Sequence, residues 1–225
     1  MIELKPYIDE HYILDFFGML NKEDIKYALI KNIDGELPSR LKDGKDIDIL
    51  VHIDDRERFA RVMSEHNWMY RTPPLGREAG WNFGYNLPEY QFWQYQPQKI
   101  DQIFYVDACF KLMCKSLMPK VWIPLNEPMQ KKAWQEQEWN EELKCWQLGP
   151  KTLFVYLFVR EVFDKHEFKD EYIQEIEKRK KYLEDDEVYE LLKTVFFGFT
   201  DELIKLVKNG EYKTIVRKYI TYQNY

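Results

Sequence analysis

The stretch Gly44–Val51, GKDIDILV, carries two aspartates one residue apart and then an unbroken apolar run. Successive side chains of a strand point to opposite faces, so a strand here places Asp46 and Asp48 on one face and the isoleucines between and after them on the other. Acids at a loop exit are most often simply solvated. Three features favour a metal site here: an apolar segment upstream, the ILV that follows directly, and a second acid-bearing segment downstream.

A divalent metal is the simplest partner for two carboxylates held this close, because without a cation they repel one another. Carboxylate oxygens are hard ligands that suit Mg²⁺ or Mn²⁺. Two such ions can clamp the attacking and leaving oxygens of a phosphoryl or nucleotidyl transfer, a mechanism that usually needs a third carboxylate from a neighbouring strand. We expect Asp101, in the segment KIDQIFYV, to be that third ligand, with Asp107, on the same face by alternation, as the fallback.

Composition narrows the class of protein. The chain has 225 residues, of which 45% are hydrophobic and 16% aromatic, enough for a sizeable core. Its 33 basic and 39 acidic residues give a net charge of −6, which disfavours nucleic acid as a partner. The three cysteines lack metal-like spacing and the chain has no signal-like start, which predicts a cytoplasmic protein. No apolar run reaches about twenty residues, so no membrane span is expected.

Hydrophobic spacing predicts an α+β half followed by an all-helical half. The first half is expected to hold a helix over 8–20, strands over 25–30 and 46–53, a helix capped by Asp54, a hairpin of 90–95 and 99–106 whose ring-rich first arm is core, and a strand over 120–125. After Asn126 the pattern is helical to the end. We therefore expect an α+β domain over residues 1–125 and a helical domain over 126–225.

The order of a first strand, a short connection and D-x-D followed by three apolar residues resembles the nucleotidyltransferase fold of the DNA polymerase beta superfamily. The resemblance implies a nucleotidyltransferase-like mixed sheet flanked by helices, and a transferase in which Asp46, Asp48 and Asp101 hold the metals that carry a nucleoside triphosphate. More narrowly, LIKNIDGELPSRLKDGKDIDILV (29–51) resembles a bacterial group often found with surface-polysaccharide genes. That likeness covers residues 24–66 well and 99–115 loosely, and it implies a role in glycan or surface-polysaccharide biosynthesis.

The chain departs from the superfamily at the end of the first strand. Lys31-Asn32 stands where the superfamily usually has Gly-Gly or Gly-Ser, whose backbone N–H groups cradle the triphosphate. We expect the side chains of Lys31 and Asn32 to contact phosphate instead, and Arg40, Lys42 and Lys45 to neutralise a phosphate tail at the mouth of the site. The expected partner is a nucleotide or another phosphorylated small molecule or glycan precursor.

Other functions stay open. A glycosyltransferase can use D-x-D to hold the metal of a nucleotide-sugar, but there the apolar strand precedes the acids, whereas here it follows them. A phosphocholine- or polyol-phosphate transferase uses the same fold, but its Gly-Gly approach and its proline before the acids are missing here. A catalytically degenerate binding module is the non-enzymatic alternative, and retention of both acids argues against it.

Overall fold

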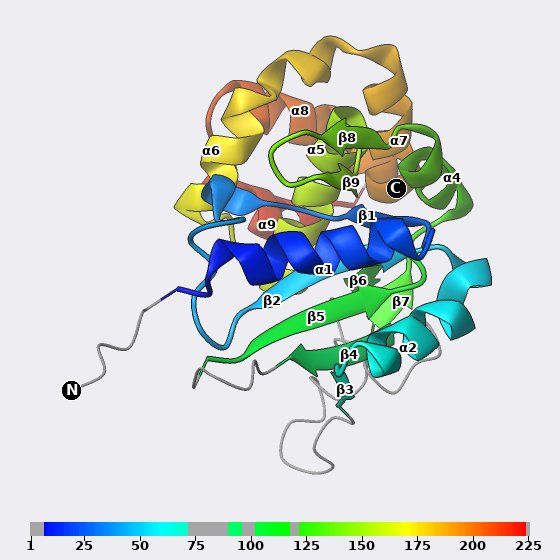
Figure 1. Cartoon of the computed structure of the whole chain (residues 1–225). Coiled ribbons are helices and arrows are strands. Elements are labelled where there is room, and N and C mark those ends of the chain that lie inside the picture. The colour runs from blue at the N-terminus through cyan, green and yellow to red at the C-terminus, as the bar shows by residue number, and fades with distance from the viewer. Residues whose placement is uncertain (1–6, 72–89, 96–101, 118–121, 224–225) are drawn as a thin grey trace. The chain divides into compact units, whose positions relative to one another are not determined.

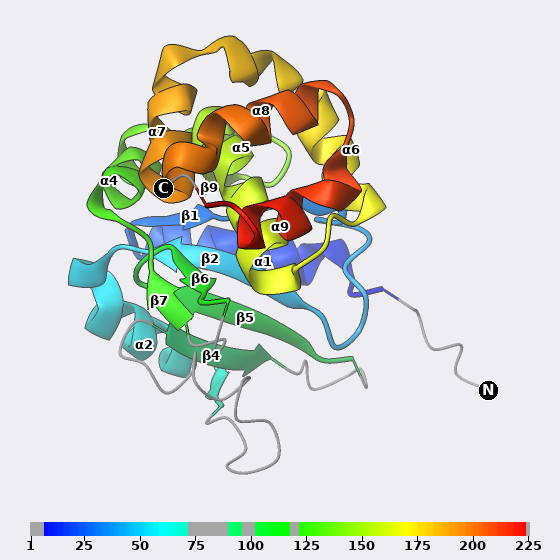
Figure 2. The ribbon, with the colours of Figure 1, turned by 180° about the vertical axis from the view of Figure 1, so that it is seen from behind.

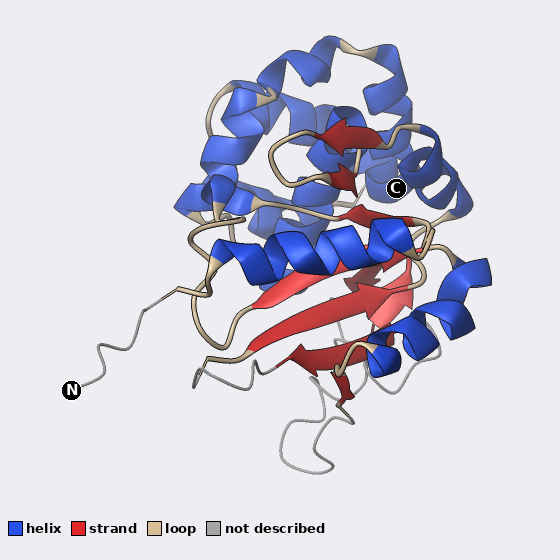
Figure 3. Ribbon diagram, viewed as in Figure 1, coloured by secondary structure: helices blue, strands red, loops and turns tan. Residues whose placement is uncertain are grey.

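The computed structural model describes residues 7–71, 90–95, 102–117 and 122–223. The chain forms two compact units, Met1–Leu112 with Gln137–Leu148, and Met113–Glu136 with Gly149–Tyr225. The first unit is built on a mixed sheet flanked by helices, and the chain is helical from residue 150 onward, so the predicted α+β class is confirmed (Figures 1 and 3). The domain limits 1–125 and 126–225 stay a prediction.

The sheet of the first unit has seven strands in the order β3-β4-β5-β2-β1-β9-β8. Their bounds are Tyr27–Leu29 (β1), Asp46–Val51 (β2), Met69–Tyr70 (β3), Tyr90–Tyr95 (β4), Phe104–Cys109 (β5), Glu138–Asn140 (β8) and Cys145–Gln147 (β9). β2 pairs with β5, and β1 with β9, in parallel, whereas every other pair is antiparallel. Figure 2 shows β2, β5 and β4 side by side from behind. The strand predicted from GKDIDILV and the antiparallel hairpin arms are confirmed, with the second arm beginning at Phe104.

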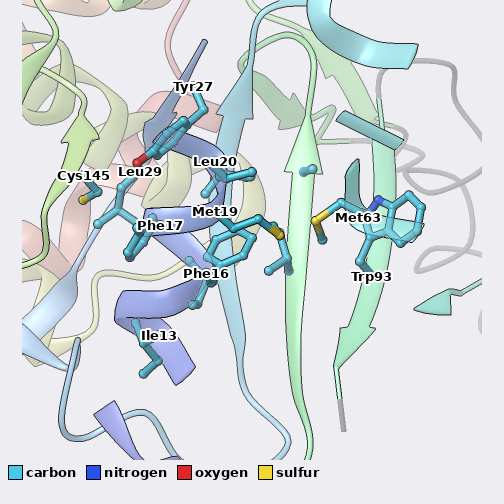
Figure 4. Close-up of a cluster of buried hydrophobic side chains, with 14 of the residues drawn as sticks. Ile13, Phe16, Phe17, Met19, Leu20, Tyr27, Leu29, Met63, Trp93 and Cys145 are labelled. Atoms are coloured by element: carbon cyan, nitrogen blue, oxygen red, sulfur yellow. The ribbon is translucent and has the colours of Figure 1, made fainter. Parts of the chain in front are cut away.

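Two helices, α1 (Glu10–Lys22) and α2 (Arg56–Glu65), pack on the apolar face of this sheet. Phe16, Phe17 and Leu20 recur at helical spacing along α1, and all are buried against strand residues such as Tyr27 and Leu29 (Figure 4). Phe17 stacks on Tyr27 with ring centroids 6.0 Å apart. This core fixes which face of β2 is apolar, and so which face carries the aspartates.

The predicted cap of α2 is wrong by one residue, because Asp55 and not Asp54 immediately precedes the helix. Asp54 lies within a short 3₁₀ turn, η2 (Ile53–Asp55), and its N–H donates to His52 Nδ1 at 3.4 Å. Asp55 immediately precedes α2, and its carboxylate accepts the Lys26 N–H at 2.8 Å and pairs with Arg58. The acid at the helix start therefore ties α2 to the neighbouring strand instead of capping it.

The hairpin β8–β9 was predicted to be helical. Asn140 Oδ1 accepts the N–H groups of Glu142 and Leu143 at 3.1 and 2.9 Å, and Lys144 takes a left-handed φ of 50°. Both features are typical of a turn, because an Asn side chain can replace a backbone partner there. The turn returns the chain so that β9 pairs with β1 through Leu29 and Gln147.

The second unit is a helical assembly with a two-stranded ribbon, β6 (Met113–Lys115) and β7 (Trp122–Pro124). Its helices are α4 (Glu127–Gln135), α5 (Pro150–Val159), α6 (Asp170–Lys178), α7 (Asp186–Phe196), α8 (Thr200–Lys208) and α9 (Tyr212–Ile220), with short turns η3 (Arg160–Lys165), η4 (Lys180–Glu184) and η5 (Phe197–Phe199) between them. α5 is buried almost all round, as expected of a central helix. Asn126 caps α4 by accepting the Met129 N–H, and Asp185 caps α7.

One turn of π-helix, η3, follows α5 and carries buried charges. Arg160 pairs with Asp164, four residues later, at 2.9 Å, and the side chains are only 12% and 3% exposed, so this ion pair is buried. Asp164 also accepts the Lys115 N–H at 2.7 Å, which ties η3 to β6. Glu161 is fully buried and accepts the Lys169 N–H at 2.9 Å.

Within the described part of the chain, no helix has the length and apolar character needed to cross a bilayer. Cys109, Cys114 and Cys145 are free and buried.

Glu161 is expected to make stability pH-dependent. Burial raises its pKa to about 7, which outweighs the Lys169 N–H and the charges of Lys165 and Arg160, while Glu171 raises it further. An acid whose folded pKa is raised is penalised when ionised, so its destabilising effect is absent below the unfolded pKa of about 4.3 and fully present above the folded one. Glu161→Gln should therefore gain stability over the wild type between pH 5 and pH 8 by on the order of 3 kcal/mol.

Urea unfolding of the wild type and Glu161→Gln at pH 5 and pH 8 measures this difference. The exposed Glu190→Gln is the control, and an equal pH dependence in wild type and Glu161→Gln would contradict the assignment.

Phe197 is expected to be strained. Its φ of 50° and ψ of −130° lie in a region that glycine enters freely and a Cβ-bearing residue does not, and the residue is 60% exposed. Phe197→Gly should raise the free energy of unfolding by about 1 kcal/mol, since relief of strain outweighs the entropy of an added glycine. Phe197→Ala keeps the Cβ and should give no gain. Thermal unfolding of the three proteins tests this, and an equal effect of Gly and Ala would rule out backbone strain as the cause.

Candidate metal centre

The loop before β2 is bonded to the start of β5. Asp43 Oδ1 accepts the Ile103 N–H at 2.7 Å, and the Gly44 N–H donates to the Ile103 carbonyl at 2.8 Å. Gly44 has a φ of +74°, a conformation that glycine adopts without steric cost. The Tyr105 N–H then donates to the Lys45 carbonyl at 3.0 Å. These bonds set the register in which β2 and β5 run side by side.

That register brings three carboxylates to one face of the sheet. Asp48 lies opposite Asp107, and Asp46 lies opposite Tyr105. Partners in a ladder share a face, while Ile47, Ile49 and Val106 on the other face are in the core. Asp46, Asp48 and Asp107 can each offer an oxygen such that all three lie within 4.8 Å of one another.

The three acids differ in exposure: Asp46 is exposed, Asp48 is half-buried and Asp107 is buried. Exposure to solvent therefore decreases from Asp46 through Asp48 to Asp107. Three hard oxygen donors at this spacing fit a divalent cation such as Mg²⁺ or Mn²⁺. The fallback Asp107 is therefore the third acid that the structure brings to the pair, and Asp101 lies outside the described residues.

Lys31 lies beside this cluster. The Ile30 N–H donates to the Asp48 carbonyl at 2.9 Å. This bond holds the next residue, Lys31, close to Asp48. Lys31 Nζ forms an ion pair with Asp48 Oδ2, and the side chains are 16% and 15% exposed. A half-buried ammonium here offsets part of the repulsion between the acids.

Asn32 and Arg40 belong to the turn that links β1 to β2. Asn32 Oδ1 accepts the Leu37 N–H at 2.9 Å, and its Nδ2 donates to the Leu37 carbonyl at 3.2 Å. Arg40 donates to the carbonyls of Asp34 and Gly35. Both side chains hold the shape of this turn, which a sequence motif alone does not reveal.

Lys42 and Lys45 are exposed on the strand-entry loop next to Asp46. Their predicted contact with phosphate stays a prediction, whereas Lys31 is in contact with Asp48. Among the five basic and amide residues predicted to contact phosphate, Lys31 forms a side-chain ion pair with an acid of the cluster.

Comparisons with known proteins give a weak likeness. No protein-family model and no curated protein matches the chain. A solution structure of the antibiotic-resistance factor ANT(2'')-Ia is similar with a TM-score of 0.44 and 9% identity, over 91% of this chain and 99% of that one. A crystal structure of ANT(2'')-Ia in complex with adenylyl-2''-tobramycin is similar with a TM-score of 0.44 and 8% identity, over 82% and 94%. Likeness at this level carries no argument about the activity of the chain.

Lys31 is expected to compete with a divalent metal for Asp48. Lys31→Met removes the competing charge, so Mn²⁺ should bind about fivefold more tightly than to the wild type, the scale of one partly screened charge pair. The metal-free variant should also be less stable, because the acids lose a nearby cation. Titration calorimetry with Mn²⁺ and thermal unfolding measure the two effects. Lys22→Met removes the same charge from α1, on the opposite face of the sheet, and should change neither; weaker Mn²⁺ binding by Lys31→Met would show that Lys31 assists the metal.

Proposed function

We propose that the chain is a metal-dependent transferase of the nucleotidyltransferase type, acting on a phosphate-bearing substrate. The observation that supports this most directly is the pairing of Asp48 with Asp107 on adjacent parallel strands, with Asp46 two residues away on the same face. A D-x-D on one strand and a third acid on its neighbour is the arrangement that the sequence resemblance implies.

Asp46, Asp48 and Asp107 are the residues proposed to hold Mg²⁺ or Mn²⁺, and Asp101 stays a prediction for the same role. When bound, the divalent metal neutralises charge at the attacking and leaving oxygens of a phosphoryl or nucleotidyl transfer. Asp46, Asp48 and Asp107 would hold that metal beside the substrate's phosphate. The sheet supplies a rigid base for this, because both strands are buried on their apolar face.

Lys31 has the second proposed role. In the metal-free chain its ammonium neutralises Asp48, and if a metal took that place the ammonium would donate to a phosphate oxygen. Lys42 and Lys45 at the loop are proposed to attract the phosphate tail to the acids, because exposed cations raise the local concentration of an anion. Arg40 and Asn32 support the turn that carries Lys31 to the site.

The biological setting is proposed to be glycan or surface-polysaccharide assembly in the cytoplasm. The support is the resemblance of residues 24–66 to the bacterial group described above. A phosphorylated sugar, a nucleotide-sugar or a nucleoside triphosphate would each present phosphate oxygens to the same three acids.

Asp48→Asn is expected to abolish metal-dependent ligand binding. In a thermal-shift screen of nucleoside triphosphates and nucleotide-sugars with Mg²⁺ or Mn²⁺, a ligand at a hundredfold its dissociation constant should add about 2.7 kcal/mol to the wild type. The metal-dependent gain should be lost in Asp48→Asn and kept in Asp54→Asn, whose acid is exposed outside the cluster. Equal metal-dependent gains in wild type and Asp48→Asn would refute the proposed site.

A further inference from the structure

An aromatic pair stands on the same face of the sheet as the acids. Phe92 lies opposite Asp107, and Tyr105 lies opposite Asp46, so both rings share the face of the carboxylates. Both are half-buried, in contrast to their neighbours Trp93 and Phe104, which point into the core. The expectation that the ring-rich arm of β4 is core holds for Trp93 and is wrong for Phe92.

The two rings form an ordered stack. Their centroids are 5.0 Å apart and their planes differ by 12°. They are diagonal neighbours across β4 and β5, a spacing at which aromatic side chains reach one another. Because β5 lies between β4 and β2, the acid-bearing strand is on the side of Tyr105 away from Phe92. A third flat ring that continued the stack would lie over β2, beside Asp46.

The neighbouring acids indicate which kind of ring would bind. The proposed function places a divalent metal and a substrate phosphate at the acid cluster one strand away, so a ligand that stacks here would also carry phosphate. A nucleotide is a molecule of this kind, with phosphate at one end and a flat ring at the other. A single aromatic face binds any base, because every base has a π-face.

We propose that Tyr105, held in orientation by Phe92, stacks on the base of a nucleotide whose phosphates lie at Asp46, Asp48 and Asp107. This inference rests on the proposed function and narrows its substrate to a nucleotide. It also accounts for binding without the glycine cradle that Lys31-Asn32 replaces, since base stacking supplies affinity that the backbone does not. Tyr105 is a binding residue in this proposal, and Phe92 is a positioning residue.

The test compares ligands with and without a base. Titration calorimetry in Mn²⁺ measures the four common nucleoside triphosphates and inorganic tripolyphosphate on the wild type and on Tyr105→Leu, Tyr105→Phe and Phe92→Leu. Leucine keeps bulk on the strand and removes the ring, and phenylalanine keeps the ring. Tyr70→Leu is the matched control, because Tyr70 is an exposed ring on β3 that lies opposite Trp93 and so shares the other face.

The wild type should prefer at least one nucleoside triphosphate over tripolyphosphate by about 5- to 150-fold, the range of one base–aromatic stack. Tyr105→Leu should lose that preference with unchanged affinity for tripolyphosphate, Phe92→Leu should lose part of it, and Tyr105→Phe and Tyr70→Leu should keep it.

Two outcomes overturn the stacking proposal: a wild type without any preference for a base, or a Tyr105→Leu variant that keeps the preference in full. Either result leaves the proposed function standing if tripolyphosphate binds in a Mn²⁺-dependent manner that Asp48→Asn abolishes. If the wild type and Asp48→Asn bind Mn²⁺ equally, the proposed function fails, and the stacking proposal fails with it.

Discussion

The parallel pairing of β2 with β5 is the constraint on which the candidate site depends. Parallel strands set partners side by side at about 4.8 Å, so the bonds from Asp43 and Gly44 to Ile103 decide which residues meet further along. A shift of one residue in this register would bring Val106 or Ala108 opposite Asp48, and both are core residues. The apolar face prevents that shift, because it would move a core side chain to the acid face.

The face of the sheet that carries the acids also has a nearby cation that reduces their mutual repulsion. Three acids in one small volume repel each other, and Lys31 supplies a positive charge from the neighbouring strand end. Lys31 stands at a position where the sequence resemblance would imply glycine, and its cation stabilises the acids in the absence of metal. If the proposed metal binds, its affinity and the stability of the metal-free fold are linked through this side chain.

Much of this could be read from the sequence. Alternation in GKDIDILV placed Asp46 and Asp48 on one face, and that inference needs only the strand repeat of two. Alternation could not choose between Asp101 and Asp107, since both fall on the same face. The register of β5 with β2 places Asp107 opposite Asp48, and Asp101 lies outside the described residues. The β8–β9 hairpin was missed because its strands are three residues long and its turn depends on one Asn140 side chain. The burial of Arg160 and Asp164 is a tertiary property that the spacing of four does not carry.

The central claim is that Asp46, Asp48 and Asp107 form one divalent-metal site. A crystal of the protein grown or soaked with Mn²⁺ and measured near the manganese absorption edge tests it most directly. The account predicts an anomalous peak in contact with carboxylate oxygens of all three residues, with Lys31 Nζ moved away from Asp48. A well-ordered site without such a peak, or a peak elsewhere with the Lys31–Asp48 pair intact, would contradict it.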